Sequence, residues 1–226
     1  MGSGSNNGSG SNATPAATAS IDKATVATEL GKTETITVSV KSSGGFTGDV
    51  TLTPALTDAT GTPLTNLTVT ASAPKVTLTA DGTATATFMV AIPTDATGAD
   101  LAATLKVHAT STAGSQDLTS AVNVAAVLTL NYDAGIGNDA TKHPSAGVEV
   151  KVKAGAKVHL HNADAISHIT HGDGAWPHET TNVNLGGLPN GTYEILTAGK
   201  AVGTTGTVGC HSHSANNTSY HKLTID

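Results

Sequence analysis

The sequence TETITVSV, residues 33–40, alternates hydroxyl or acidic side chains with Ile36, Val38 and Val40. Successive side chains of a β-strand point to opposite faces, so this alternation predicts a strand with one apolar and one polar face. Similar runs recur along the chain, which contains 39 Thr residues. Because the branched side chains of Thr, Val and Ile favour strands over helices, we predict an all-β protein.

The region from residue 20 to residue 124 carries seven such runs, separated by turn signals rich in Gly, Pro and Asp. Their spacing favours an antiparallel sandwich over a parallel sheet with helical crossovers. We predict an immunoglobulin-like β-sandwich that lacks the Cys and Trp framework of antibody domains. The predicted strands span residues 33–40, 49–56, 64–70, 75–79, 83–91, 102–110 and 118–124.

The N-terminal segment, residues 1–19, consists almost entirely of Gly, Ser, Asn, Thr and Ala. Such a segment buries too little apolar surface to offset the entropy that it would lose on ordering. We therefore predict a disordered, Gly/Ser-rich tether in front of the first domain. Attachment of the protein to a surface through this end is one role that the tether allows.

The composition changes in the second half, residues 125–226. Nine of the ten His residues, the single Cys and the single Trp all lie between His143 and His221. Short alternating runs separated by Gly-rich turns predict a second β-sandwich there. Its predicted strands span residues 127–132, 148–153, 157–162, 167–170, 192–196, 204–210 and 220–225.

Two motifs of this second half combine histidines with the single cysteine. The first is a strand pair followed by an Asn-x-Asp loop (Asn162 to Asp164) that ends at His168; the second is Cys210-His211-Ser212-His213 before the last strand. Together they resemble the cupredoxins, the blue copper proteins. The resemblance covers residues 125–226 and implies a Greek-key sandwich that binds copper. Carried over by position, it implies that His168, Cys210 and His213 are the metal ligands. A thiolate with two imidazoles suits copper in both of its oxidation states.

The sequence departs from the cupredoxin pattern at the weak axial ligand, because no Met follows Met89 and the domain has no Gln. The axial position is open to a backbone carbonyl, to water or to an imidazole such as His221. His211 competes with His213 as the second imidazole ligand. The pair His159 and His161 shares one face of a predicted strand, which is compatible either with a surface metal site or with a solvated face.

These features predict a carrier rather than an enzyme: a copper-binding protein that transfers electrons to and from an unknown redox partner protein. The alternatives are copper handling without electron transfer, and a structural surface or adhesion protein with a vestigial metal site. The net charge of −6, with 11 Lys and no Arg, argues against nucleic acid as a partner. We predict no transmembrane segment, and the Thr-rich, Cys-poor composition is similar to that of exported bacterial proteins of the periplasm or cell surface.

Overall fold

The computed structural model describes residues 13–132, 149–163, 165, 170–172, 176, 191–210 and 220–226. All regular structure in these residues is β, which confirms the predicted fold class. None of the described residues form a helix long and apolar enough to cross a membrane. Nine strands precede residue 133: β1 (Ala16–Ile21), β2 (Thr25–Leu30), β3 (Thr33–Ser43), β4 (Gly48–Asp58), β5 (Thr68–Ala71), β6 (Lys75–Leu78), β7 (Thr83–Ala91), β8 (Leu101–Ser111) and β9 (Gly114–Tyr132).

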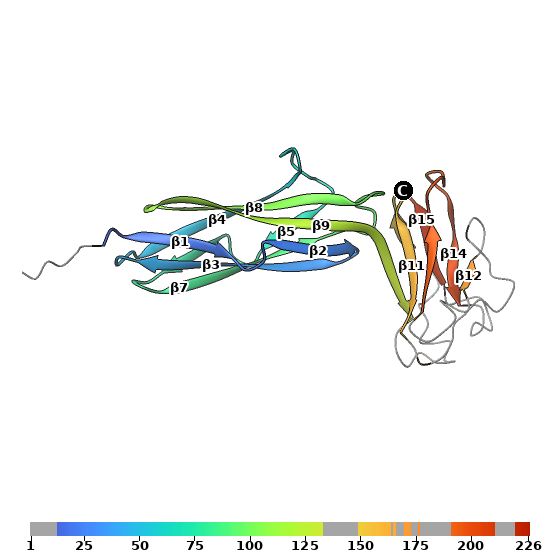
Figure 1. Cartoon of the computed structure of the whole chain (residues 1–226), viewed down its shortest axis with the longest axis horizontal. Helices are drawn as coiled ribbons and strands as arrows, with labels where there is room; N and C mark the ends of the chain where they lie inside the picture. The colour runs from blue at the N-terminus through green and yellow to red at the C-terminus, as the bar shows by residue number, and fades with distance from the viewer. Residues whose placement is uncertain are drawn as a thin grey trace, which may run out of the picture.

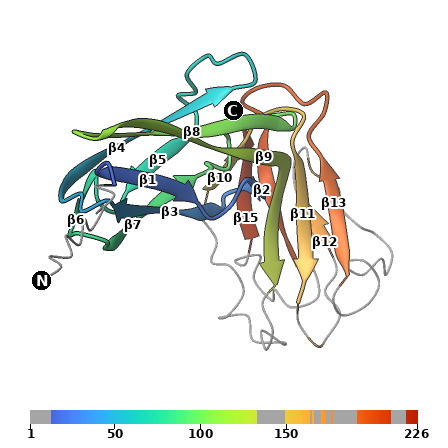
Figure 2. The same ribbon diagram turned by 60° about the vertical axis from the view of Figure 1, so that its left-hand side comes forward.

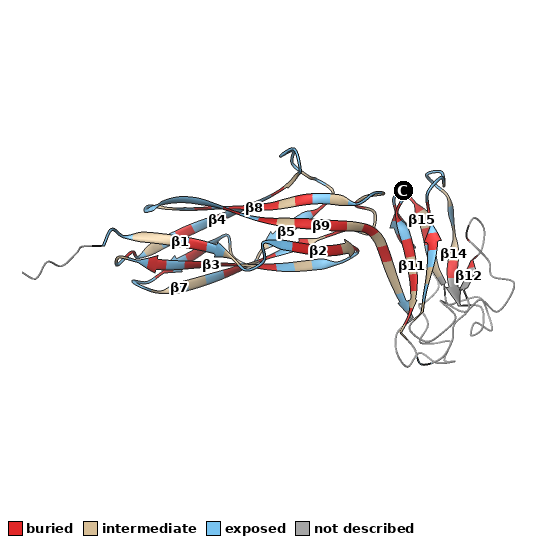
Figure 3. Cartoon of the chain, in the orientation of Figure 1, coloured by how far each residue is buried: buried red, intermediate tan, exposed pale blue. Residues whose placement is uncertain are grey.

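The first sandwich packs a four-stranded sheet, in the order β1-β3-β7-β5, against strands β2, β9, β8, β4 and β6 of a larger sheet (Figure 1). The alternation seen in the sequence sets the core, since Ile36 and Val38 of β3 are fully buried and belong to the same apolar cluster as Phe88 of β7 and Leu105 of β8. The other face of β3 is exposed or half-buried and carries Thr33, Thr35, Thr37, Ser39, Lys41 and Ser43. Figure 3 shows this alternation of buried and exposed residues along the strands.

Strand β1 corrects the predicted tether, because residues 16–19 belong to a strand and not to a flexible segment. The backbone of β1 pairs with β3 from Ala16 opposite Ser43 to Ile21 opposite Val38. The side chain of Gln116 also bonds both the N–H and the C=O of Ala19, at 3.0 and 2.9 Å. Residues far away in the sequence therefore provide the hydrogen-bond partners that the backbone of β1 needs. The composition of the segment alone does not indicate these partners.

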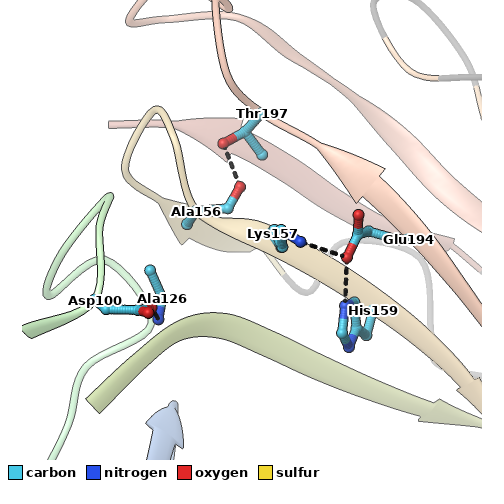
Figure 4. Close-up of polar contacts among 7 residues, drawn as sticks. All are labelled: Asp100, Ala126, Ala156, Lys157, His159, Glu194 and Thr197. Carbon is cyan, nitrogen blue, oxygen red and sulfur yellow. Dashed lines mark hydrogen bonds and ion pairs between the residues drawn. The ribbon is translucent and has the colours of Figure 1, made fainter. Parts of the chain in front are cut away.

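Strand β9 joins the two halves of the chain. It pairs antiparallel with β8 up to Val124, and from Val127 onward it pairs in parallel with β11 (Lys157–Asn162). The predicted domain boundary at residues 124 and 125 therefore falls where one continuous strand changes partner. In the short stretch of β9 between its pairing with β8 and its pairing with β11, the N–H of Ala126 donates to the Asp100 carboxylate at 2.9 Å (Figure 4).

The strands of the second half belong to two sheets, one of which is the larger sheet of the first half, continued through β9 to β11 and β13. Strand β11 lies between β9 and β13, and the three strands run side by side in Figure 2. The other sheet has the order β10-β15-β14-β12, with β10 parallel to β15. Apolar residues of both sheets, including Val158, Leu160, Ile195, Val208 and Leu223, are fully buried. The strands are β10 (Glu149–Val152), β12 (Thr170–Gly172), β13 (Thr192–Leu196), β14 (Thr205–Cys210) and β15 (Tyr220–Ile225).

Candidate metal centre

Cys210 is the last residue of β14, and its backbone partner in the neighbouring strand is Thr170. The pairing continues with His171 opposite Gly209 and Gly172 opposite Val208. Thr170 follows the predicted ligand His168 by two positions. Residue 168 itself lies outside the described residues, as do the predicted ligands His211 and His213, and the Cys210 side chain is also not described.

Among the histidines whose side chains the structure describes, His221 lies closest in register to Cys210. It lies opposite Val208, two residues before Cys210 in β14. Its strand, β15, continues with the fully buried Leu223 and Ile225, and the alternation of β-strand side chains puts His221 on the same inner face. Burial lowers the pKa of His221, which favours the neutral imidazole.

The Nδ1 atom of His221 is buried and has no hydrogen-bond partner among the described residues. A buried polar atom without a partner is costly, and ligation is one way to satisfy it. The Nδ1 atom of His221 therefore fits the role of an additional metal ligand at this end of the sandwich, for which the sequence offers no Met. Within the described residues, no group of three or more His, Cys, Asp or Glu side chains is arranged to hold a metal ion.

Trp176 belongs to the core of the second half. It is 4% exposed, and its Nε1–H donates to the carbonyl of Leu223 at 3.3 Å. The ammonium group of Lys200 lies 5.6 Å from the centre of the indole ring, within the range of a cation–π interaction. The indole thus packs against the same strand, β15, that carries His221.

A second group of polar side chains lies on the outer face of β11, at the junction of the two halves. His159 Nε2 contacts Glu194 Oε2 at 3.0 Å, and Lys157 Nζ contacts the same oxygen at 3.0 Å (Figure 4). These contacts, first that of His159 and then that of Lys157, lower the pKa of Glu194 and keep it ionised. His161 Nδ1 lies 3.0 Å from Thr192 Oγ1.

An open groove runs beside this face and is lined by both histidines, by residues of β9 and β13, and by residues of β2, the turn after it and the start of β3. We name it the junction groove. Its opposite wall carries Glu29, Lys32 and Glu34. The alternation of β11 predicts that His159 and His161 share a face, but nothing in the sequence pattern indicates that these three residues, more than 120 positions away, face them.

Comparisons with known proteins give a likeness of fold. No protein-family model matches the chain, and no curated protein sequence is similar to it. A family 123 glycoside hydrolase from Clostridium perfringens aligns with 48% of this chain and 27% of its own, at 14% identity and a TM-score of 0.36. Domains 4 and 5 of the S-layer protein SbsC align over 50% of this chain and 47% of theirs, at 23% identity and a TM-score of 0.33.

The periplasmic chaperone SfaE aligns over 92% of this chain and 98% of its own, at 10% identity and a TM-score of 0.34. The chain spans less than half the length of the first two structures, the hydrolase and the S-layer domains. At these identities the likeness concerns the fold alone, and it identifies neither a family nor an activity.

Proposed function

We propose that the second half of the chain binds one copper ion through His168, Cys210 and His213 and acts as an electron carrier. Bound copper would supply one-electron chemistry by alternating between Cu(II) and Cu(I). The chain's part is to hold a thiolate and two imidazoles together in a pocket from which water is excluded.

The pairing of Thr170 with Cys210 carries this proposal. Residues 168 and 210 are 42 positions apart, and the antiparallel ladder of β12 and β14 brings the chain just beyond His168 beside Cys210. Two ligands from separate loops can then meet at one end of the sandwich. Had β12 paired with the other end of β14, a shared site would have required a much longer loop.

The surroundings of β14 and β15 also suit a soft metal ion. Val208 and Leu223 are fully buried, so the interior next to this end of the sandwich is apolar. A low local dielectric strengthens metal–ligand electrostatics and limits solvent access. His221 would then supply a neutral imidazole nitrogen on the interior side as a further ligand, in place of the Met that the sequence lacks.

The composition supports an exported location, in the bacterial periplasm or at the cell surface, where such a carrier meets a redox partner protein. In this proposal the first sandwich acts as a spacer between the copper domain and its attachment point. The continuous strand β9 suits that role, because a shared strand transmits orientation better than a flexible linker does.

The test is to add Cu(II) to metal-free protein and record visible and electron paramagnetic resonance spectra. Thiolate ligation gives an intense charge-transfer band, and Cys210→Ser should abolish it. His213→Ala should weaken or shift the band, while His211→Ala should leave it nearly unchanged. His221→Gln should retain the band and change the reduction potential.

The matched control is His108→Asn, which removes an exposed imidazole from the first sandwich. It should leave every spectrum unchanged. An unchanged spectrum in Cys210→Ser contradicts thiolate ligation, and equal effects of His211→Ala and His213→Ala contradict the choice of imidazole. Copper binding without reversible reduction would leave a copper-handling protein and would exclude the electron carrier.

A further inference from the structure

The junction groove contains two imidazoles in an arrangement that the proposed copper centre does not use. His159 and His161 alternate with the fully buried Val158 and Leu160, so both project from the outer face of β11. Residues two apart on a strand are about 6.6 Å apart along it, and metal–imidazole bonds are about 2.0–2.1 Å long. Two such side chains can therefore turn toward one ion between them.

Each of the two rings has one nitrogen engaged by a neighbour on β13 and one nitrogen that has no partner among the residues that the structure describes. Nε2 of His159 contacts the ionised Glu194 carboxylate, which leaves Nδ1. Nδ1 of His161 contacts the Thr192 hydroxyl, which leaves Nε2. Metal-binding histidines commonly have their second nitrogen held by a carboxylate or another polar group, because that contact fixes the tautomer and the ring orientation.

The opposite wall of the groove favours a cation. Glu29 Oε2 accepts from Thr129 Oγ1 at 2.9 Å, and Thr129 is the β9 residue paired with His159. Glu34 Oε1 accepts from Thr28 Oγ1 at 2.9 Å. Each carboxylate is thus anchored through one oxygen beside the groove, and together with Glu194 they outnumber the cationic Lys32 and Lys157.

We propose that His159 and His161 form a two-imidazole binding site for a divalent late transition-metal ion such as Zn²⁺, Cu²⁺ or Ni²⁺. Imidazole nitrogen suits these ions, and water completes the coordination. Two protein ligands do not amount to a group of three, which agrees with the arrangement of the described residues. The site is independent of Cys210, so it stands or falls separately from the copper centre.

The chain contains a natural control for this site. Lys106-Val107-His108 in β8 repeats the Lys-Val-His sequence of residues 157–159, and Asp117 contacts both Lys106 and His108 as Glu194 contacts Lys157 and His159. The second imidazole is missing there, because Thr110 occupies the position that corresponds to His161, and His108 contacts Asp117 through Nδ1 where His159 contacts Glu194 through Nε2. Binding at β11 and not at β8 would therefore show that one exposed histidine beside an acidic residue is not sufficient.

The experiment is a Ni²⁺ titration of the full-length, ¹⁵N-labelled Cys210→Ser protein, followed by paramagnetic broadening of backbone amide signals. The Cys210→Ser background removes the thiolate, and the broadening shows where the ion is bound. Amides of residues 157–161, 129–131 and 192–194 should broaden at lower Ni²⁺ concentrations than those around His108. His161→Gln should raise the required concentration roughly tenfold to hundredfold, because a second ligand on the same strand acts at high effective concentration.

Glu194→Gln should raise it roughly tenfold by loosening the His159 ring. The amide spectrum itself shows whether each variant is folded, so a loss of binding cannot be mistaken for unfolding. Broadening around His108 at the same Ni²⁺ concentration as at β11 would overturn the proposal. So would a folded His161→Gln variant whose β11 amides broaden as in the parent protein.

Discussion

Gly98 and Gly155 lie in contact where the two halves of the chain meet, and neither position has room for a side chain. A Cβ atom on Gly155 would lie 2.5 Å from the carbonyl oxygen of Gly98, and one on Gly98 would lie 2.1 Å from that of Ala154. Both obstacles are backbone atoms, so they cannot swing aside. The turn before β11 and the loop before β8 are therefore fitted to each other.

Gly155→Ala should destabilise the protein by about 1–3 kcal/mol through this overlap, in addition to the strain of its φ of +100°. The matched variant is Gly199→Ala, whose φ is +79° but which has no atom within 4 Å of a new Cβ. It carries the backbone strain alone. Urea unfolding followed by circular dichroism measures both, and equal losses would contradict a tight contact at Gly98.

Thr197 stabilises the turn that contains Gly155 through hydrogen bonds of its hydroxyl group. Its buried hydroxyl accepts from the N–H of Gly155 at 2.9 Å and donates to the carbonyl of Ala156 at 2.5 Å (Figure 4). Thr197→Val keeps the shape and leaves both backbone groups without this partner, so the free energy of unfolding should fall by about 1–3 kcal/mol. Thr205→Val, at an exposed position of β14, should change it by less than about 0.5 kcal/mol.

The sequence predicts local structure well because the alternation of residues such as Ile36 and Val38 directly records which face is buried. It does not predict β1, since AATASI has little apolar character and the strand depends on β3 and on Gln116, about 97 positions away. It also divides β9 into two predicted strands. Between the two predicted strands, the N–H of Ala126 donates to Asp100, a contact that no local pattern indicates.

In the candidate sites, too, the sequence indicates the face on which a side chain lies but not the distant residues that it meets. Alternation within β11 and β15 indicates which way His159, His161 and His221 face. The meeting of Thr170 with Cys210 and of Glu29 with the β11 face depends on strand pairing over 40 to about 130 positions. The cupredoxin resemblance supplied the expectation for the first meeting, and nothing in the sequence supplied it for the second.

Acid should weaken the fold partly through Glu194 and Asp117. Contacts from His159 and Lys157 lower the pKa of Glu194, and contacts from Lys106 and His108 lower that of Asp117. A carboxylate with a lowered folded-state pKa stabilises the fold above its ordinary pKa, here 4.5 for Glu and 3.8 for Asp, and this stabilisation is lost as the pH falls below that value.

The melting temperature of the protein should therefore drop between pH 5 and pH 3, within a window of about two units set by these ordinary pKa values. The double variant Asp117→Asn/Glu194→Gln should show a flatter dependence than either single variant. Both groups are solvent-exposed, so the difference is small and should shrink further in high salt. A double variant with the unaltered acid dependence would rule out these two carboxylates as contributors.

Trp176 offers a measure of packing in the second half. Trp176→Ala should cost about 3–5 kcal/mol, since it removes a large buried side chain from beside β15. Trp176→Phe retains most of the apolar contact but loses the hydrogen bond to the Leu223 carbonyl, so its cost should be smaller. Equal costs in denaturant unfolding would show that the hydrogen bond, and not the buried volume, is what matters.

A gain-of-function variant tests whether a second imidazole is sufficient for metal binding. Thr110 is exposed and lies two residues beyond His108 in β8, opposite Ser115 of β9, just as His161 lies opposite Thr192 of β13. Thr110→His would therefore reproduce the junction pair on a strand that already carries the Lys and the His, beside Asp117 of the neighbouring strand β9. Amides around His108 should then broaden at a Ni²⁺ concentration roughly tenfold lower than in the parent, because two linked ligands bind more tightly than one.

Thr110→Ser is the matched control and should leave the titration unchanged. If a folded Thr110→His protein binds Ni²⁺ at β8 no better than the parent does, a His-x-His pair beside an acidic residue is not enough. The affinity at β11 would then depend on the opposite wall of the junction groove, which β8 lacks. Glu29→Gln and Glu34→Gln would in that case weaken Ni²⁺ binding at β11 as much as His161→Gln does.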